Sequence, residues 1–254
     1  MTEIYEQQNI FFDNLSGKPK NISELNTEAV KMRVLDWHTA SKIIEENHYT
    51  HVAPPAQISL GFYIEGELST VIMYANGANF RAAQGIMKGG KQEDMCELIR
   101  LFSFDWAPPN IESYCIGQSF KWLKENTKKK WLLSYADLNQ KHIGFIYQAT
   151  NWIYTGLGAK TKQLWTLDGK PIHTRTIWSH LGNSSDVELI KTKYAEMGRV
   201  FEVKENLLPK ARYVYLLGNK RERKQMMESL KVPVFTKYPK TYQEALAMEE
   251  EMKN

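Results

Sequence analysis

Cysteine and long apolar stretches are both scarce in this chain. It has only two Cys among 254 residues, Cys96 and Cys115, and they form no CxxC pair. We therefore expect no disulfide framework and a reducing compartment. No apolar run approaches the ~20 residues of a membrane-spanning helix. The first residues are acidic and polar, so we expect no signal peptide and a soluble intracellular protein.

A strong charge of one sign is also missing. The chain carries 33 Lys and Arg against 29 Asp and Glu, a net charge of +4. This mild excess permits a polyanionic partner without requiring one, because local clustering of cations matters more than their sum. A hydrophobic fraction of 43% suits a globular protein, and the length suits one large domain with a small extension.

The most informative stretch lies between Trp131 and Gly156. Residues 131–135 form a short apolar run that predicts a buried strand, and Asp137 lies just past its carboxyl end. Residues 141–150 follow a helical rhythm, and 152–154 predict another strand. A carboxylate in the loop of such a strand, helix and strand unit is where an open α/β sheet places a ligand. The same pattern also suits a packed unit in which Asp137 only caps a helix.

The remaining pattern alternates strands and helices. We expect further strands at 31–35, 57–64, 68–74, 95–104, 200–203 and 212–217. A hairpin is expected from 163–167 and 172–178 around Asp168-Gly169. Helices are expected at 36–47, 110–126, 185–195, 221–230 and 241–252. We interpret 76–92, which is rich in Gly and Asn, as a mobile loop outside the core. This order predicts an α/β or α+β fold.

Three sequence motifs resemble one known family. The motif S-Y-A-D-x-x-Q-x-H-x-G-x-I-Y-Q-A-x-x-W-x-Y-x-G at 134–156 resembles the signature of the Mom family of phage DNA-modification proteins. Two further matches are E-L-I-R-L-F-S-F at 97–104 and R-Y-V-Y-L-L-G-N-K-R-E-R-K at 212–224, which is followed by Tyr238-Pro239-Lys240. Together the three motifs span most of the chain.

The resemblance implies both a fold and an activity. The implied fold is GNAT-like (acyl-CoA N-acyltransferase-like), a mixed central sheet flanked by helices. We expect an amino-terminal extension at 1–29, a catalytic domain at 30–218 and a basic helical tail at 219–254 packed on it. The implied activity transfers a carbamoylmethyl group to N6 of adenine in double-stranded DNA. This would protect phage DNA from restriction in the cytoplasm of the bacterial host.

The resemblance also places five residues around the active site: His48, Tyr49, Arg100, Asp137 and Tyr147. Adenine N6 is a poor nucleophile, so it needs a hydrogen-bond acceptor or base, for which Asp137 is the candidate. His48 and Tyr49 could donate, accept or shuttle a proton. Arg100 lies in an apolar strand and must be paired. It either bridges a carboxylate such as Asp137, as a purely structural pair would, or binds an anionic part of substrate or donor.

A second group of residues is assigned to substrate and DNA. Ser119, Ser134, Tyr135 and Trp152 are candidates for substrate binding, although both Tyr135 and Tyr147 also suit core packing. An extruded base needs an aromatic partner, for which Tyr49, Trp106 and Trp152 are open choices. Candidates for phosphate contact are Lys128, Lys129, Lys130, Lys160, Lys162, Lys220, Arg221, Arg223 and Lys224. Each cluster also suits a solvated surface.

The donor and any metal stay open at this point. Acetyl-CoA enzymes of the GNAT fold usually carry an R/Q-x-x-G-x-G/A loop that holds pyrophosphate on backbone N–H groups. The equivalent stretch here, D-W-A-P-P-N-I-E-S-Y at 105–114, has no glycine. The donor could carry a glycine-derived group or be acetyl-CoA-like. Iron has been suggested for the family, and His48 and His51 could ligate a metal.

Two alternative functions remain. One is a GNAT-type N-acyltransferase that acts on a small amine or an aminoacyl-tRNA, which predicts a CoA requirement and unchanged DNA. The other is a nucleic-acid-binding protein without catalysis, which predicts unchanged nucleosides in cells that express it.

Overall fold

The structure is a computed structural model that describes residues 22–77, 80–159, 164–172, 174–182, 186–205 and 207–252. Most of the amino-terminal extension expected at 1–29 lies outside these residues, as do Lys160 and Lys162.

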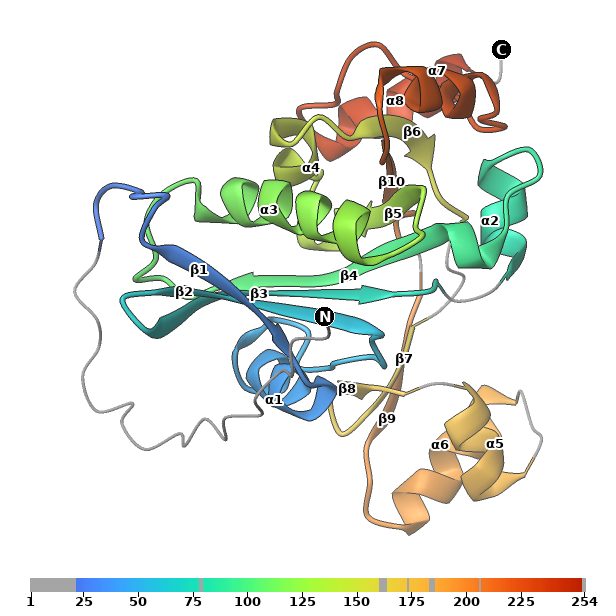
Figure 1. Ribbon diagram of the computed structural model, residues 1–254. Helices are drawn as coiled ribbons and strands as arrows, with labels where there is room; N and C mark the ends of the chain where they lie inside the picture. Colours follow the sequence, from blue (N-terminus) through green and yellow to red (C-terminus); the bar gives the residue numbers. More distant parts are fainter. Residues whose placement is uncertain are drawn as a thin grey trace.

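A seven-stranded sheet forms the centre of the molecule (Figure 1). Its strand order is β1-β2-β3-β4-β5-β10-β6, and every neighbouring pair is antiparallel except β4 and β5. The strands are β1 (Val30–Leu35), β2 (Ile58–Ile64), β3 (Glu67–Ala75), β4 (Met95–Ser103), β5 (Trp131–Ala136), β6 (Ile153–Leu157) and β10 (Ala211–Leu216). The α/β class with a mixed central sheet is therefore confirmed.

The parallel pair opens towards its carboxyl end. Residues 95–98 of β4 pair with residues 131–134 of β5, with Leu98 opposite Ser134 as the last pair. Both strands continue, β4 to Ser103 and β5 to Ala136, but without further pairing to each other. On its other side β4 has a register shift against β3 between Met73 and Tyr74, and such bulges bend a strand. The two strands therefore part and leave a gap within the sheet.

Helices cover both faces of the sheet. Helix α3 (Ile111–Asn126) lies on one face, over a core that includes Cys96, Leu98 and Leu132. The other face carries two separate apolar clusters, one beneath α1 (Trp37–Asn47) and one beneath α2 (Phe80–Ile86). Because successive strand residues point to opposite faces, alternate residues of β4 and β5 belong to different cores.

Two expectations for this part of the chain have different outcomes. The helix expected at 36–47 is confirmed: the Asp36 side chain accepts from Thr39 N–H, and the helix ends at Asn47. The mobile loop expected at 76–92 is wrong for part of its length, because α2 occupies residues 80–86. Ala83 and Ile86 are buried in the cluster beneath this helix. Gly85 lies within this helix, and Gly89 lies in the turn that follows it.

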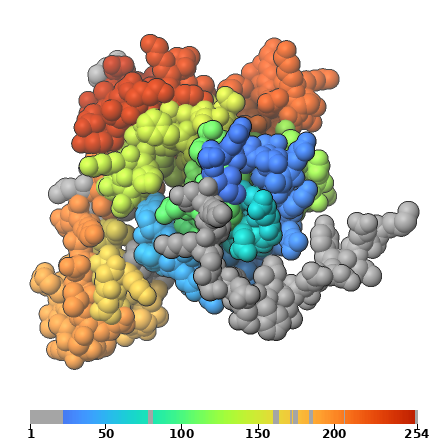
Figure 2. Space-filling view, turned by 90° about the vertical axis from the view of Figure 1, so that its left-hand side faces the viewer, coloured from blue at the N-terminus to red at the C-terminus, as the bar shows by residue number. Residues whose placement is uncertain are grey.

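A small lobe is inserted between β6 and β10. It contains β7 (Leu164–Leu167), β8 (Lys170–Pro171), α5 (Thr174–Leu181), α6 (Val187–Glu196) and β9 (Phe201–Lys204). Its strands form a sheet of their own, in the order β8-β7-β9. Its core includes Leu167, Ile177, Ile190, Tyr194 and Phe201. The space-filling view shows the lobe beside the main body, in orange and yellow (Figure 2).

The lobe corrects one expectation from the sequence. The Asp168-Gly169 turn is present, with positive φ at both residues, as a primed hairpin turn requires. However, the strand expected at 172–178 is wrong, because α5 begins at Thr174. Ile177 is fully buried against the lobe core, and Leu181, four residues later, packs against the same core. A spacing of four residues is typical of a helix. The seven residues 172–178 are too few for their apolar pattern to distinguish a helix from a strand.

The carboxyl-terminal segment packs on the sheet. Helix α7 (Lys220–Glu228) begins with a capping box between Asn219 and Glu222, and α8 (Tyr242–Glu251) lies next to β6. The Leu157 N–H donates to the Glu249 carboxylate at 3.0 Å, which covers part of the exposed edge of β6. Within the described residues, no helix combines the length and the apolar character that membrane crossing would need.

Candidate active site

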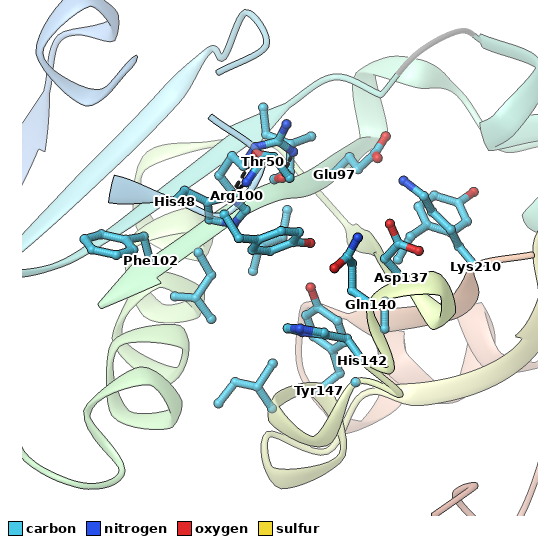
Figure 3. Close-up of a pocket in the computed structure, with 18 of the residues that line it drawn as sticks. His48, Thr50, Glu97, Arg100, Phe102, Asp137, Gln140, His142, Tyr147 and Lys210 are labelled. Carbon is cyan, nitrogen blue, oxygen red and sulfur yellow. Dashed lines mark hydrogen bonds between the residues drawn. The ribbon is translucent and has the colours of Figure 1, made fainter. Parts of the chain in front are cut away.

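A cleft of about 1070 Å³ lies where β4 and β5 part (Figure 3). Its walls are β4 from Glu97 onward, Ala75 at the end of β3 and Gly77 just after it, the loop after α1, most of the segment from Tyr135 to Tyr147, and Lys210. The five residues assigned to the active site, which come from three distant segments, all line this one cleft: His48, Tyr49, Arg100, Asp137 and Tyr147. The cleft is thus the candidate active site.

Asp137 follows β5 and begins a single 3₁₀ turn, Leu138–Gln140. Its Oδ1 accepts from the Asn139 N–H and from Asn139 Nδ2, both at 3.0 Å. The capping role that the sequence left open is therefore present. Oδ2 makes no hydrogen bond within the part of the chain that the structure describes. One oxygen fixes the carboxylate, and the other is free to accept a proton or a hydrogen bond from a ligand.

Tyr147 lies in α4 (Phe145–Ala149), a helix much shorter than the 141–150 expected from its rhythm. Gly144 precedes it with φ of 83°, where a Cβ would come 2.5 Å from the Tyr213 ring. Only glycine fits this tight entry. The Tyr147 hydroxyl lies 2.8 Å from Ser134 Oγ, which also lies 2.8 Å from the Leu98 carbonyl oxygen. Burial raises the pKa of Tyr147 to about 12, so its hydroxyl stays protonated at neutral pH.

His48 caps the carboxyl end of α1 and is held by Thr50. Its Nδ1 lies 2.8 Å from Thr50 Oγ1 and accepts from the Thr50 N–H at 3.2 Å. Because a backbone N–H can only donate, this contact assigns the imidazole proton to Nε2. Burial lowers the pKa of His48 to about 4, and the positive charges of Arg100 and two neighbouring imidazoles act in the same direction. His48 is therefore neutral at pH 7.

Arg100 is held by main-chain carbonyls rather than by an acid. Its Nε donates to the Val52 oxygen at 2.9 Å, and its Nη1 donates to the Ile99 oxygen at 2.6 Å. No carboxylate among the described residues forms an ion pair with it, so the bridge to Asp137 is absent. Burial lowers the pKa of Arg100, yet a guanidinium stays charged. Its charge is available to an anionic or carbonyl group in the cleft.

Aromatic rings gather at the rim of the cleft. The Tyr49 ring lies between two imidazoles, with centroids 4.3 Å from His48 and 5.4 Å from His142. Tyr49 is 52% exposed and Phe145, also in the cleft wall, is 61% exposed. His142 lines the cleft as well and thus belongs to the rim. Exposed rings beside a cavity are suited to stack an extruded base.

The substrate-binding candidates are divided by the structure. Tyr135 lines the cleft. Ser134 is buried behind the wall, where it supports Tyr147. Ser119 is buried within α3 and lies 2.6 Å from the Tyr74 hydroxyl. Trp152 is fully buried in the core beneath α3. These last three side chains support the walls and have no surface on the cleft.

Sequence reasoning missed Glu97, Glu112 and Lys210, which also line the cleft. Glu97 lies in the same apolar strand as Arg100, so the signal that singled out the arginine could have found it. Lys210 carried no such signal. It is brought to the cleft because Asn139 exchanges hydrogen bonds with Leu208, at 3.0 and 2.8 Å.

The basic clusters proposed for phosphate contact lie at the amino end of β5, and one of them reaches the margin of the cleft. Lys128, Lys129 and Lys130 precede β5, and Lys129 Nζ donates to Asn76 Oδ1 at 2.8 Å, between the cleft residues Ala75 and Gly77. Helix α7 follows β10, and the Leu217 N–H donates to the Lys130 oxygen at 2.9 Å, so the α7 cluster of Lys220, Arg221, Arg223 and Lys224 begins at that same end. Lys130 also forms an ion pair with Asp94 at 3.0 Å.

The start of α3 does not fit a CoA pyrophosphate. Pro108 and Pro109 have no N–H to offer, and the N-cap residue Asn110 has φ of 65° with no side-chain cap. Glu112 adds a carboxylate to the first turn, and burial raises its pKa. A phosphate-binding helix start needs free N–H groups and no carboxylate. Nor does a metal ligand set appear: the described residues hold no group of three His, Cys, Asp or Glu side chains placed around one ion.

Comparison with known proteins gives related folds and one family. Solved structures similar to this chain include a ribosomal-protein-S5-alanine acetyltransferase from Vibrio fischeri (TM-score 0.43, 7% identity, covering 77% of this chain and 97% of that one). A putative acetyltransferase from Acinetobacter baylyi is also similar (TM-score 0.42, 10% identity, covering 76% and 94%). Both scores are below 0.5, and nothing about activity follows from them.

Sequence comparison is more specific. The chain is 24% identical over 207 residues to the methylcarbamoylase Mom of Escherichia phage Mu, which covers 80% of this chain and 82% of that protein. The family model of the Mom proteins matches residues 29–240, a span that contains every element lining the cleft. On this match, the chain belongs to the Mom protein family.

Proposed function

We propose that this protein transfers a carbamoylmethyl group to N6 of adenine in phage DNA and thereby protects that DNA from host restriction. The relative from phage Mu is named a methylcarbamoylase, and the chain shares its family. The observation that carries the proposal is the convergence of His48, Tyr49, Arg100, Asp137 and Tyr147 on one cleft. Such a cleft, with aromatic rings at its rim, suits a base extruded from the duplex.

The chemistry we propose is a substitution at carbon. The adenine N6 attacks the methylene carbon of a donor that carries a leaving group next to a carboxamide. The N6–carbon bond forms, the bond to the leaving group breaks, and the leaving group departs with the electron pair. The free Oδ2 of Asp137 accepts the proton that N6 loses. His48 Nε2–H and the Tyr147 hydroxyl are neutral donors that can stabilise the negative charge on the departing group.

The donor we propose is not a CoA thioester. The prolines and Glu112 at the start of α3 oppose the binding of a pyrophosphate. Arg100 remains free to hold an oxygen of the donor or of the substrate. We derive no step through iron, because no three ligand side chains of the described residues converge. DNA itself is held by its backbone at the cleft rim, where Lys141 is exposed.

The proposal is tested by mass spectrometry of nucleosides from the DNA of cells that express the protein. The wild type is expected to produce a deoxyadenosine carrying a carbamoylmethyl group, and Asp137→Asn to produce none. Asp94→Asn is the matched control, since it removes a carboxylate at the far end of β5. Unmodified DNA from cells with well-expressed wild type would overturn the proposal. Acylation of a small amine or of aminoacyl-tRNA, dependent on CoA, would instead support the acyltransferase alternative.

A further inference from the structure

The inner end of the cleft holds two charges that the proposed proton transfer does not use. Glu97 lies in β4 opposite Leu133, within the last paired residues of the parallel ladder. Lys210 immediately precedes β10, which is two strands away from β4 in the sheet. Both side chains line the cleft. Neither forms a hydrogen bond or an ion pair with another side chain in the part of the chain that the structure describes.

The backbone fixes the positions of these two residues. Glu97 is held by strand pairing on both sides, with Ala75 of β3 and with Leu133 of β5. The Lys210 carbonyl oxygen accepts from the Gly158 N–H at 2.8 Å, and Asn139 holds the preceding segment through Leu208. The two charges therefore face a common space from rigid elements, as a preformed binding site requires.

The charges of this space balance. Burial raises the pKa of Glu97, while the nearby cations of Lys210 and Arg100 act in the opposite direction. With Glu112 and Asp137 the cleft lining has three carboxylates, against the three cations Arg100, Lys141 and Lys210. Opposite charges that face each other across a cavity favour a neutral group with a donor at one end and an acceptor at the other. A group with a net charge is attracted by the side chains of one sign and repelled by those of the other.

We propose that Glu97 and Lys210 form the subsite for the terminal carboxamide of the transferred group. Glu97 accepts an N–H of the carboxamide, and Lys210 donates to its carbonyl oxygen. A carboxylate of the same shape would place an oxygen against Glu97 and lose a hydrogen bond. The pair thus selects a carbamoylmethyl group over a carboxymethyl group. This inference rests on the proposed function, because it deepens the assignment of the donor.

The test is a set of NMR titrations of the full-length protein with acetamide, acetate and glycine. Acetamide is expected to bind the wild type about tenfold more tightly than acetate, the effect of one hydrogen bond of about 1.4 kcal/mol. Glu97→Gln is expected to remove this preference, and Lys210→Met to weaken acetamide binding. Glu93→Gln, at an exposed residue outside the cleft, is the matched control and is expected to behave as the wild type.

Three results would overturn the subsite. They are equal binding of acetamide and acetate by the wild type, tighter binding of glycine than of acetamide, or an unchanged preference in folded Glu97→Gln. Thermal unfolding checks the fold of each variant, and Lys210→Met carries the test if Glu97→Gln is unfolded. The outcome is separable from that of the proposed function. Unmodified DNA together with a preference for acetamide would refute only the function, whereas modified DNA without that preference would refute only the subsite.

Discussion

Charged side chains on the parallel strands β4 and β5 differ in their burial and in whether they form an ion pair. At the amino end of β5, Lys130 forms an ion pair with Asp94 while its side chain stays 62% exposed. On the neighbouring strand β4, the cleft residues Glu97 and Arg100 are partly buried and have no ion-pair partner among the described residues. A solvated surface pair changes stability little, whereas a partly buried charge without a partner is unfavourable. The difference identifies the cleft as the place where a ligand, rather than the fold, completes the contacts.

The sharpest contrast is expected between two Asp→Asn variants at the two ends of β5. Asp137→Asn keeps the shape and one capping oxygen but removes the proton acceptor. We expect modification of DNA to fall at least ~100-fold, the usual size of a general base effect. Asp94→Asn breaks the pair with Lys130, in which the Asp94 side chain is 18% exposed, and is expected to stay within about twofold of the wild-type rate because Asp94 lies outside the cleft. The measurement is the modified fraction of deoxyadenosine by mass spectrometry. Similar losses in both variants would remove the distinction between the ends.

The next effect is expected from Tyr147→Phe. This change removes the hydroxyl that lies 2.8 Å from Ser134 Oγ but leaves the ring that packs against Trp152. We expect a decrease of roughly 10-fold, which corresponds to one hydrogen bond of about 1.4 kcal/mol. Ser134→Ala, which removes only the support behind the hydroxyl, should cost less. A Tyr147→Phe variant with full activity and normal thermal unfolding would show that the ring alone matters.

A smaller effect, visible mainly in the pH profile, is expected from Thr50→Val. The Thr50 hydroxyl lies 2.8 Å from His48 Nδ1, and a hydrogen bond to the neutral imidazole opposes its protonation. In the wild type, activity that depends on neutral His48 is retained above its pKa of about 4 and lost below it. Removing the hydroxyl raises this pKa, so the acidic limb should move to higher pH. Thr50→Ser should restore the wild-type profile, and an unmoved limb in Thr50→Val would contradict the role of the hydroxyl.

The smallest effect on chemistry is expected at the basic end. Replacing Lys128, Lys129 and Lys130 together with Gln removes cations at the amino end of β5, of which Lys129 contacts Asn76 at the margin of the cleft. With saturating DNA we expect the modification rate to stay within about twofold. If this surface meets DNA, the slope of log affinity against log salt should decrease by at most ~3. A large loss of rate at saturating DNA would show that these lysines take part in the catalytic step. The basic end and the cleft would then not differ in function. Lys191→Gln in the lobe serves as the control.

The sequence was most informative where a residue type contradicts its surroundings. Arg100 in an apolar strand and Asp137 at a strand end both line the cleft, and the same logic applied to Glu97 would have added a third residue. It was least informative where position depends on distant pairing. Lys210 reaches the cleft only through the link between Asn139 and Leu208, which no local pattern encodes. The three buried candidates, Ser119, Ser134 and Trp152, show that a motif does not distinguish the residues of a wall from those behind it.

Because β4 and β5 separate beyond Leu98, the sheet contains an unpaired strand edge in its interior. Beyond Leu98, β4 still pairs with β3, but its other side has no partner strand in the described part of the chain. Alternate main-chain amides of that side therefore lack a strand partner among the described residues. These amides should exchange with deuterium quickly in the free protein and slowly when a substrate fills the gap. The backbone of β4 would then report occupancy directly, without any label or any knowledge of the donor.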